Sequence, residues 1–129
     1  MNRNFTKWTI RIFVTLFIVF LLGISAISLT IGWGVKQQAK SAQQQFPGDR
    51  VEALIAMVDC ASCDLRDRDH AVWALGMLAD RRALPVLERY YTGNKCDHSR
   101  DICQYELKKA LKLVRDGRNP SAFLWNWMA

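Results

Sequence analysis

The sequence predicts an all-α protein, with one transmembrane helix followed by a short solenoid of about four helices. First, residues 12–35 contain no charged side chain, and at about 1.5 Å per residue this helix is longer than the ~30 Å hydrocarbon core of a bilayer. Second, the remaining apolar residues recur at helical spacing, and no alternating pattern indicates a strand. Third, part of the chain repeats after 31 or 32 residues, which is typical of stacked helix pairs.

Composition divides the chain into five segments. A basic flank at 1–11 precedes the membrane helix at 12–35, and a polar stalk or linker follows at 36–47. A helical domain covers 48–118, and an aromatic tail covers 119–129. The stalk consists of good helix formers and shows no apolar face, so it is either a continuation of the membrane helix or a disordered linker.

The charges around the apolar run predict its orientation. Arg3, Lys7 and Arg11 precede it with no acidic residue among them, whereas the chain from Lys36 onward has 15 basic and 12 acidic residues. The positive-inside rule then places the N-terminus in the cytoplasm and the domain in the periplasm or outside the cell. The apolar run is too long for a cleaved signal peptide, which favours an uncleaved signal-anchor. The mixed charges of the domain also argue against nucleic acid as a partner.

Four helices are predicted within the domain, each from its apolar spacing and its flanking residues. In the first, Val51, Leu54, Ile55 and Val58 share one face, and Asp49 is a good N-cap. Gly117 is expected to end the last helix. The predicted helices cover about 49–59, 67–79, 83–91 and 100–115.

The repeat carries a resemblance to a known family. Asp49-Arg50 with Ala53-Leu54 matches Asp80-Arg81 with Ala83-Leu84, and residues 69–87 closely resemble a HEAT-like repeat of the phycobilisome-lyase type. The resemblance implies that Gly76 allows close helix contact, that Asp80 caps the turn and that Pro85 opens the next helix. It also implies a helix-pair stack that usually binds proteins, but not lyase activity. The matching positions are Ala71, Ala74, Leu75, Gly76, Asp80, Ala83, Leu84, Pro85 and Leu87.

The four cysteines lie in two regions that a helix stack would bring to one edge. Cys60 and Cys63 occupy the loop between the first two predicted helices, Cys96 lies in a later loop, and Cys103 is expected inside the last helix, facing the core. In an oxidising compartment the expected state is two disulfides and no free thiol. Pairing between the loops fits this geometry, either Cys60–Cys96 with Cys63–Cys103 or the crossed alternative, whereas a local Cys60–Cys63 bond is less expected.

Two other uses of the cysteines are weaker interpretations. Redox activity at Cys60–Cys63 is disfavoured because Cys60 follows a helix C-terminus, where the helix dipole opposes a thiolate. A four-cysteine zinc site is disfavoured because the spacing from Cys96 to Cys103 is wide and because it needs a reducing compartment. His70 has no nucleophile to activate, and His98 is expected to be a loop residue. We therefore expect no enzyme activity, no cofactor, no metal and no small-molecule substrate.

The tail is rich in aromatic residues. Phe123, Trp125 and Trp127 lie within nine residues of Ala129, and they are expected to cap the open end of the solenoid, or else to contact a partner or the membrane interface. The sequence as a whole predicts a membrane-anchored, non-catalytic module for binding or assembling proteins. The alternatives are a membrane-tethered thiol–disulfide protein and a small structural subunit of a membrane complex.

Overall fold

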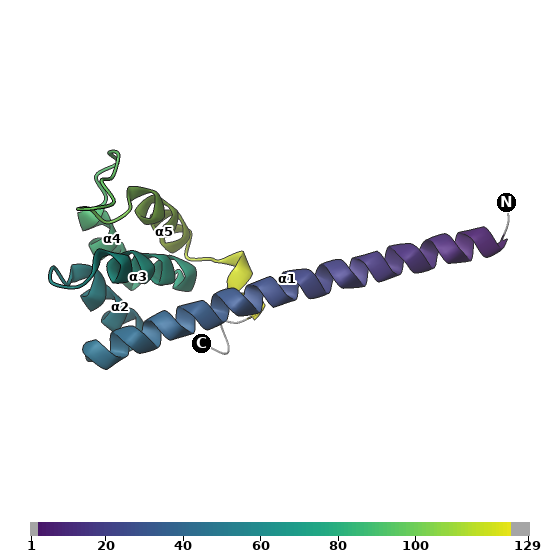
Figure 1. Ribbon diagram of the computed structural model, residues 1–129, viewed down its shortest axis with the longest axis horizontal. Coiled ribbons are helices and arrows are strands. Elements are labelled where there is room, and N and C mark those ends of the chain that lie inside the picture. Colours follow the sequence, from purple (N-terminus) through teal and green to yellow (C-terminus); the bar gives the residue numbers. More distant parts are fainter. Residues whose placement is uncertain (1–2, 125–129) are drawn as a thin grey trace.

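The structure is a computed structural model that describes residues 3–124 and the side chains of residues 6–122. This part of the chain is helical and contains no strand, which confirms the predicted all-α class (Figure 1). The elements are α1 (Arg3–Gln45), α2 (Arg50–Asp59), α3 (Leu65–Leu78), the 3-10 turn η1 (Arg81–Ala83), α4 (Leu84–Tyr90), α5 (Gln104–Asp116) and the 3-10 turn η2 (Pro120–Leu124).

The long helix α1 projects from the domain as a rod. Its 43 residues correspond to about 65 Å, and it contains an 18-residue window of mean hydropathy 2.7, of which only 6% is buried. Large apolar side chains from Trp8 to Trp33 are exposed along it. By length and composition, α1 is a helix that can cross a membrane.

The second half of α1 belongs to the core of the domain. One face is buried at every third or fourth residue, at Ser28, Gly32, Val35, Ala39 and Ala42. The predicted stalk is therefore a continuation of the membrane helix, which was one of the two alternatives. It has a buried face, however, and the prediction that it shows no apolar face was wrong. The buried side chains of this segment, Ala39 and Ala42, are small and allow close helix packing. Alanine adds little to an apolar periodicity, so this face was not recognised in the sequence.

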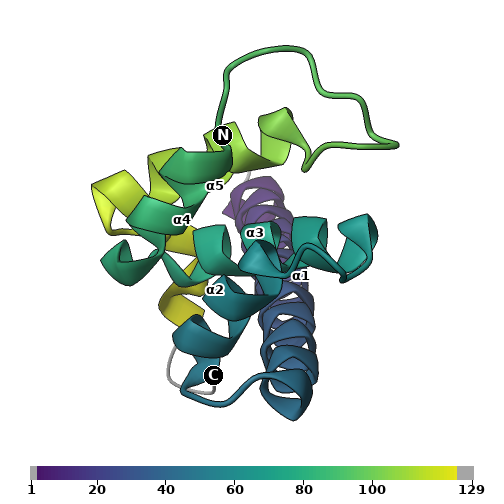
Figure 2. The same cartoon turned by 90° about the vertical axis from the view of Figure 1, so that its left-hand side faces the viewer.

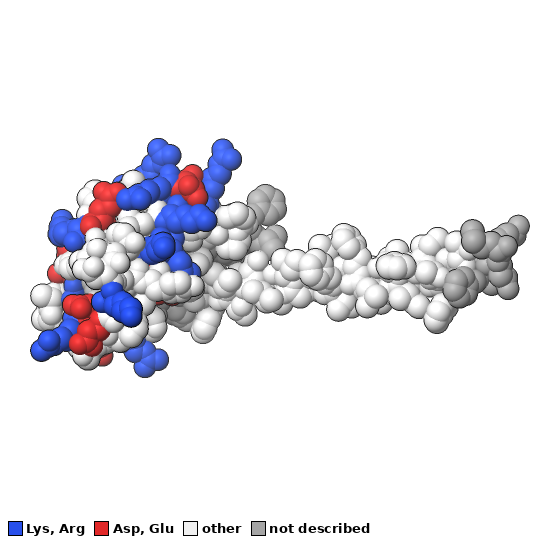
Figure 3. Space-filling view, turned by 90° about the horizontal axis from the view of Figure 1, so that it is seen from above, with Lys and Arg blue, Asp and Glu red and all other residues white. Residues whose placement is uncertain are grey.

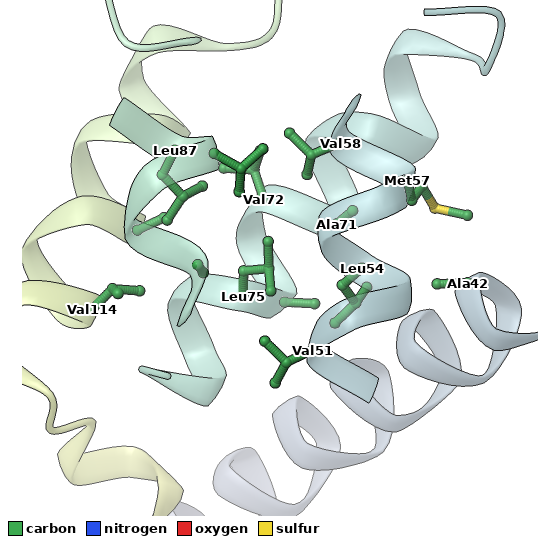
Figure 4. Close-up of a cluster of buried hydrophobic side chains, with 14 of the residues drawn as sticks. Ala42, Val51, Leu54, Met57, Val58, Ala71, Val72, Leu75, Leu87 and Val114 are labelled. Atoms are coloured by element: carbon green, nitrogen blue, oxygen red, sulfur yellow. The ribbon is translucent and has the colours of Figure 1, made fainter. Parts of the chain in front are cut away.

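The helices form three layers (Figures 1 and 2). The second half of α1 packs on α2 and α3, and the pair α2–α3 in turn carries the pair α4–α5. Apolar side chains from all of these helices form one continuous cluster (Figure 4). Its largest fully buried members are Leu54, Met57, Leu75, Leu87, Leu107, Val35, Val58, Val72 and Val114.

Gly76 lies at a close contact between α3 and α5. A Cβ atom placed on Gly76 would lie 2.8 Å from the Cα atom and 2.9 Å from the Cβ atom of Ala110. Real Cβ atoms do not come this close, so any side chain at this position forces the two helices apart. Pro85 lies in the first turn of α4, where its missing N–H leaves no hydrogen bond unmade.

Two predicted helix starts differ from the structure. Asp64 caps α3 by accepting a hydrogen bond from the Arg66 amide, so α3 begins at Leu65. The last long helix begins at Gln104 rather than near Arg100, because a local turn holds the preceding residues. In that turn Asp97 accepts hydrogen bonds from the amide and hydroxyl of Ser99. The long loop of residues 91–103 is the result.

The chain returns to α1 after α5. The side-chain amide of Asn119 donates to the Met77 carbonyl at 2.8 Å, and Asn119 Oδ1 accepts from the amide and hydroxyl of Ser121. This turn leads into η2, which packs against α1 and buries Ala122. The described start of the tail thus connects the last layer of helices to the first.

Because one face of α1 is buried, an added negative charge is expected to affect stability very differently at two neighbouring positions. Ala42 is fully buried, whereas Ser41 is exposed. Ala42→Asp places an unpaired charge in the core and is expected to lower the free energy of unfolding by roughly 3–5 kcal/mol. Ser41→Asp adds the same charge to the solvent side and is expected to change it by no more than about 0.5 kcal/mol. Thermal unfolding of the full chain in detergent, followed by near-UV circular dichroism, compares them; equal melting curves would contradict the packing of α1.

The contact at Gly76 gives a second prediction. Gly76→Leu is expected to overpack the α3–α5 contact and to cost roughly 1–3 kcal/mol of stability. Gly23→Leu is the matched control, because a Cβ on Gly23 meets nothing within 4 Å. The same melting measurement applies, and an unchanged melting temperature for Gly76→Leu would show that the two helices are not in contact there.

Candidate functional site

A charged cluster joins the starts of α2 and α4. Arg82 Nη1 donates to Asp49 Oδ2 at 2.6 Å, and its Nη2 donates to Asp80 Oδ2 at 3.0 Å. Asp49 also caps α2 by accepting from the amides of Val51 and Glu52, and Asp80 caps η1 by accepting from the Arg82 amide. Asp49 and Asp80 thus each cap a helix start, and one arginine holds the two caps together.

The same contacts shift the pKa values within this cluster. The Glu52 amide and then the Arg82 guanidinium lower the pKa of Asp49, and the hydrogen bond from Arg82 lowers the pKa of Asp80. Both carboxylates raise the pKa of Arg82. Asp49 and Arg82 each remain half exposed, so the ion pairs add only modestly to stability. Because the charges satisfy one another, the cluster acts as a brace between the starts of α2 and η1.

Further contacts join the two helix pairs at a similar sequence offset. Arg89 Nη1 donates to Asp59 Oδ1 at 2.9 Å, which ties the ends of α4 and α2. The Cys103 amide donates to Asp69 Oδ1 at 2.8 Å, which ties the start of α5 to α3. The residues in these pairs are 30 and 34 positions apart, so each helix of the first pair contacts its counterpart in the second.

A shallow groove on the last layer is the best candidate for a binding surface. It is lined by Tyr91, Lys108, Leu111, Lys112, Arg115 and Asp116, and we call it the α5 groove. Most of its lining is apolar, although Leu111 itself is almost fully buried. Lys108, Lys112 and Arg115 line it at one-turn spacing along α5, together with the single acidic residue Asp116. Such a surface can bind a segment that is both apolar and acidic.

Two cations of the groove have no acidic partner among the described side chains. Arg115 pairs with Glu88 at 2.9 Å, but Lys108 and Lys112 form no ion pair within that part of the chain. Figure 3 shows that Lys and Arg gather over the domain with fewer acidic side chains between them, while the adjoining stretch of α1 carries no charge. The lysines of the groove are therefore free to bind an external anionic group.

The cysteines pair differently from the prediction. Cys60 and Cys63 form a disulfide, with their Cα atoms 5.4 Å apart, and Cys96 and Cys103 are free thiols. The predicted disulfides between the two loops and the predicted absence of free thiols are therefore wrong. Cys103 is the N-cap residue of α5 and not a core residue inside it, so it lies beside Cys96 in the same loop.

Each of the two histidines has a polar neighbour in the structure. The side-chain amide of Gln38 lies 3.4 Å from His70 Nδ1, within the contact of α1 with α3. His98 lies against Cys96, with its Nε2 atom 3.7 Å from the sulfur. Cys96, His98 and Cys103 place one donor atom each within 4.8 Å of one another, and they are the only group of three potential metal ligands among the described residues. This group was not predicted, because His98 was expected to be only a loop residue and Cys103 to lie inside the last helix.

The other predicted site residues have mixed outcomes. Gly76, Asp80 and Pro85 lie at a helix contact, a cap and a first turn, respectively. Trp125 and Trp127 lie outside the described residues, as does the side chain of Phe123. The α5 groove was not predicted, although Lys108, Lys112 and Arg115 recur at one-turn spacing along the polar face of an amphipathic helix.

Comparison with known proteins adds no relative. No protein-family model, no curated protein and no solved structure matches this chain.

Proposed function

We propose that this protein is a membrane-anchored, non-catalytic assembly module that holds a HEAT-like helical domain against the outer surface of a membrane and binds an acidic protein segment in the α5 groove. The observation that carries the proposal is the continuity of α1, which passes without a break from an exposed apolar rod into the core of the domain. A protein that only tethers its domain would have a flexible linker between the membrane helix and the domain. A continuous helix instead fixes the position of the domain's binding surface relative to the membrane.

The burial along α1 indicates where the membrane would end. Position 28 is the first buried residue of the described helix, so residues 8–27 are free to contact lipid, and 20 residues span about 30 Å. Trp8 suits one interface, and Arg11 can extend its charge to the same side. The domain then lies directly on the opposite surface, and η2 lies near it because it packs on α1.

The orientation proposed from the sequence has a direct test. Because the cations at Arg3, Lys7 and Arg11 precede the apolar run, the domain is expected on the exoplasmic side. An enzyme reporter that works only after export, fused after Ala129, is expected to be active, and a reporter that works only in the cytoplasm is expected to be silent. Exchanging the three cations for glutamine is expected to weaken this bias. Activity of the cytoplasmic reporter alone would overturn the orientation.

The HEAT-like stack is supported by the way the layers meet. The contacts of Arg82, Arg89 and Cys103 join the helix pairs at offsets of 30 to 34 residues. A stack of only two repeats leaves apolar faces open at both ends, and such proteins need capping elements. In this proposal the second half of α1 caps the first end, where another repeat would otherwise stand, and the α4–α5 pair forms the other end.

The charge of the α5 groove defines its partner. Lys108 and Lys112 form no ion pair among the described side chains, and the cations of the mostly apolar groove outnumber its one acidic residue, Asp116. An acidic, amphipathic segment is therefore the complementary ligand. The groove belongs to the layer farthest from α1. A partner bound there does not compete with the membrane helix, which suits a module that brings a second protein to the membrane.

A photo-crosslinking amino acid at position 112 tests the partner. We expect it to form an adduct in native membranes, and peptide mapping should locate the linkage in an acidic segment of the other protein. Lys108→Glu in the same chain is expected to reduce the adduct at least tenfold, because it reverses a charge of the groove. Lys36→Glu is the matched control, since Lys36 is an exposed lysine on α1. No adduct, or linkage to a basic segment, would contradict the proposal.

The second candidate function is thiol–disulfide exchange. It is favoured by the Cys60–Cys63 disulfide, which lies in a loop whose two central residues are exposed. Against it, Cys60 is the C-cap residue of α2, where the helix dipole disfavours the thiolate needed for attack. Replacing both cysteines with serine separates the two functions, because it abolishes exchange and is expected to leave the adduct at position 112 unchanged.

A further inference from the structure

We propose that Cys96, His98 and Cys103 form a binding site for a single thiophilic metal ion, of which Zn²⁺ is the representative. The site is separate from the α5 groove and from the Cys60–Cys63 disulfide. It lies in the loop of residues 91–103, at the end of the domain away from the apolar half of α1 (Figure 1).

The geometry of the three donors is close to that of a metal site. In a tetrahedral zinc site, bond lengths of about 2.3 Å to sulfur and about 2.0–2.1 Å to nitrogen put S and N about 3.6 Å apart and two S atoms about 3.8 Å apart. The Cys96 sulfur lies 3.7 Å from His98 Nε2, and all three donor atoms lie within 4.8 Å of one another. Ligation therefore needs any pair of donor atoms to close by no more than about 1.2 Å.

The loop is fixed at its ends, so its donors do not have to be gathered from an open chain. Gln104 Oε1 accepts from the Thr92 amide at 2.8 Å, and its Nε2 donates to the Tyr90 carbonyl at 3.1 Å. At the other end the Cys103 amide donates to Asp69 Oδ1 on α3. The turn at Asp97 then brings Cys96 and His98 back toward Cys103, because the Arg100 and Asp101 amides both donate to the Asp97 carbonyl.

The donor set selects the class of metal. Two thiolates and one imidazole suit Zn²⁺ and other thiophilic ions and do not suit Mg²⁺ or Ca²⁺, which require oxygen ligands. The site needs Cys96 and Cys103 reduced, as they are in the structure, although the proposed exoplasmic side favours their oxidation; a bound ion would hold both sulfurs as thiolates. Binding displaces the protons of the two thiols, so Zn²⁺ uptake releases up to two protons per site. Three protein ligands leave the fourth position of a tetrahedron for water or for a ligand from a partner, since His98 is exposed and the cysteines are half-buried.

The bound ion would also close the longest loop of the domain. Among the described residues, this loop contributes Ile102 to the buried cluster and packs Tyr91 against it, so apolar packing orders its two ends and not residues 92–101. A metal ion that bonds to residues 96, 98 and 103 supplies the missing constraint. The Cys60–Cys63 disulfide provides the corresponding covalent closure in the α2–α3 loop.

Zinc retention by the full chain tests the site. The protein is solubilised in detergent, reduced under anaerobic conditions, incubated with Zn²⁺ and desalted. We expect one zinc ion per chain, protection of two thiols from alkylation, and slower proteolysis of the loop after Lys95 and Arg100. Cys96→Ser, Cys103→Ser and His98→Ala are each expected to lower retention at least tenfold. Cys60→Ser combined with Cys63→Ser is the matched control and is expected to retain one ion.

Three results would overturn the site. The first is a reduced wild-type chain that retains no zinc. The second is a double variant at Cys60 and Cys63 that loses zinc as fully as Cys96→Ser does, which would place the metal elsewhere. The third is a Cys96–Cys103 disulfide in protein taken from membranes into acid and alkylated at once, because the same two sulfurs cannot bind a metal in that state.

Discussion

The burial of one face of α1 against α2 and α3 is the contact on which the rest of the structure depends. Two helix pairs alone leave the outer face of the first pair exposed, and Val35, Ala39 and Ala42 cover it. The same helix carries the apolar rod. The element that can anchor the chain is thus also the element that completes its core, and η2 strengthens this arrangement by packing on α1 from the other end of the sequence.

Charged residues contribute mainly to the register between layers. Arg82 joins two helix caps, Arg89 joins two helix ends, and Asp69 holds the start of α5. These contacts are partly exposed, so each is weak by itself, but together they specify how the pairs align. Apolar packing supplies most of the stability. The lysines of the α5 groove take no part in this network, which is why they remain available.

The sequence predicted the features that depend on long apolar patterns and strong caps. The all-α class, the apolar first helix and the cap at Asp49 follow from such signals and are present in the structure. The features it missed depend on small residues or on three-dimensional proximity. Ala39 and Ala42 lack the bulk that marks a buried face, and the turn at Asp97 decides that Cys103 lies beside Cys96. The Cys60–Cys63 pairing likewise required the actual path of the loop.

In the proposed membrane arrangement, the absence of a break between the apolar part of α1 and the core would couple the orientation of the domain to the thickness of the bilayer. A membrane helix that is too long for its bilayer tilts, whereas one that is too short thins the bilayer around it. In this chain a tilt cannot be absorbed by a hinge, because residues on both sides of position 28 belong to one helix. The domain would tilt together with the helix. A change in lipid composition that alters bilayer thickness would therefore change the part of the domain surface that faces the membrane.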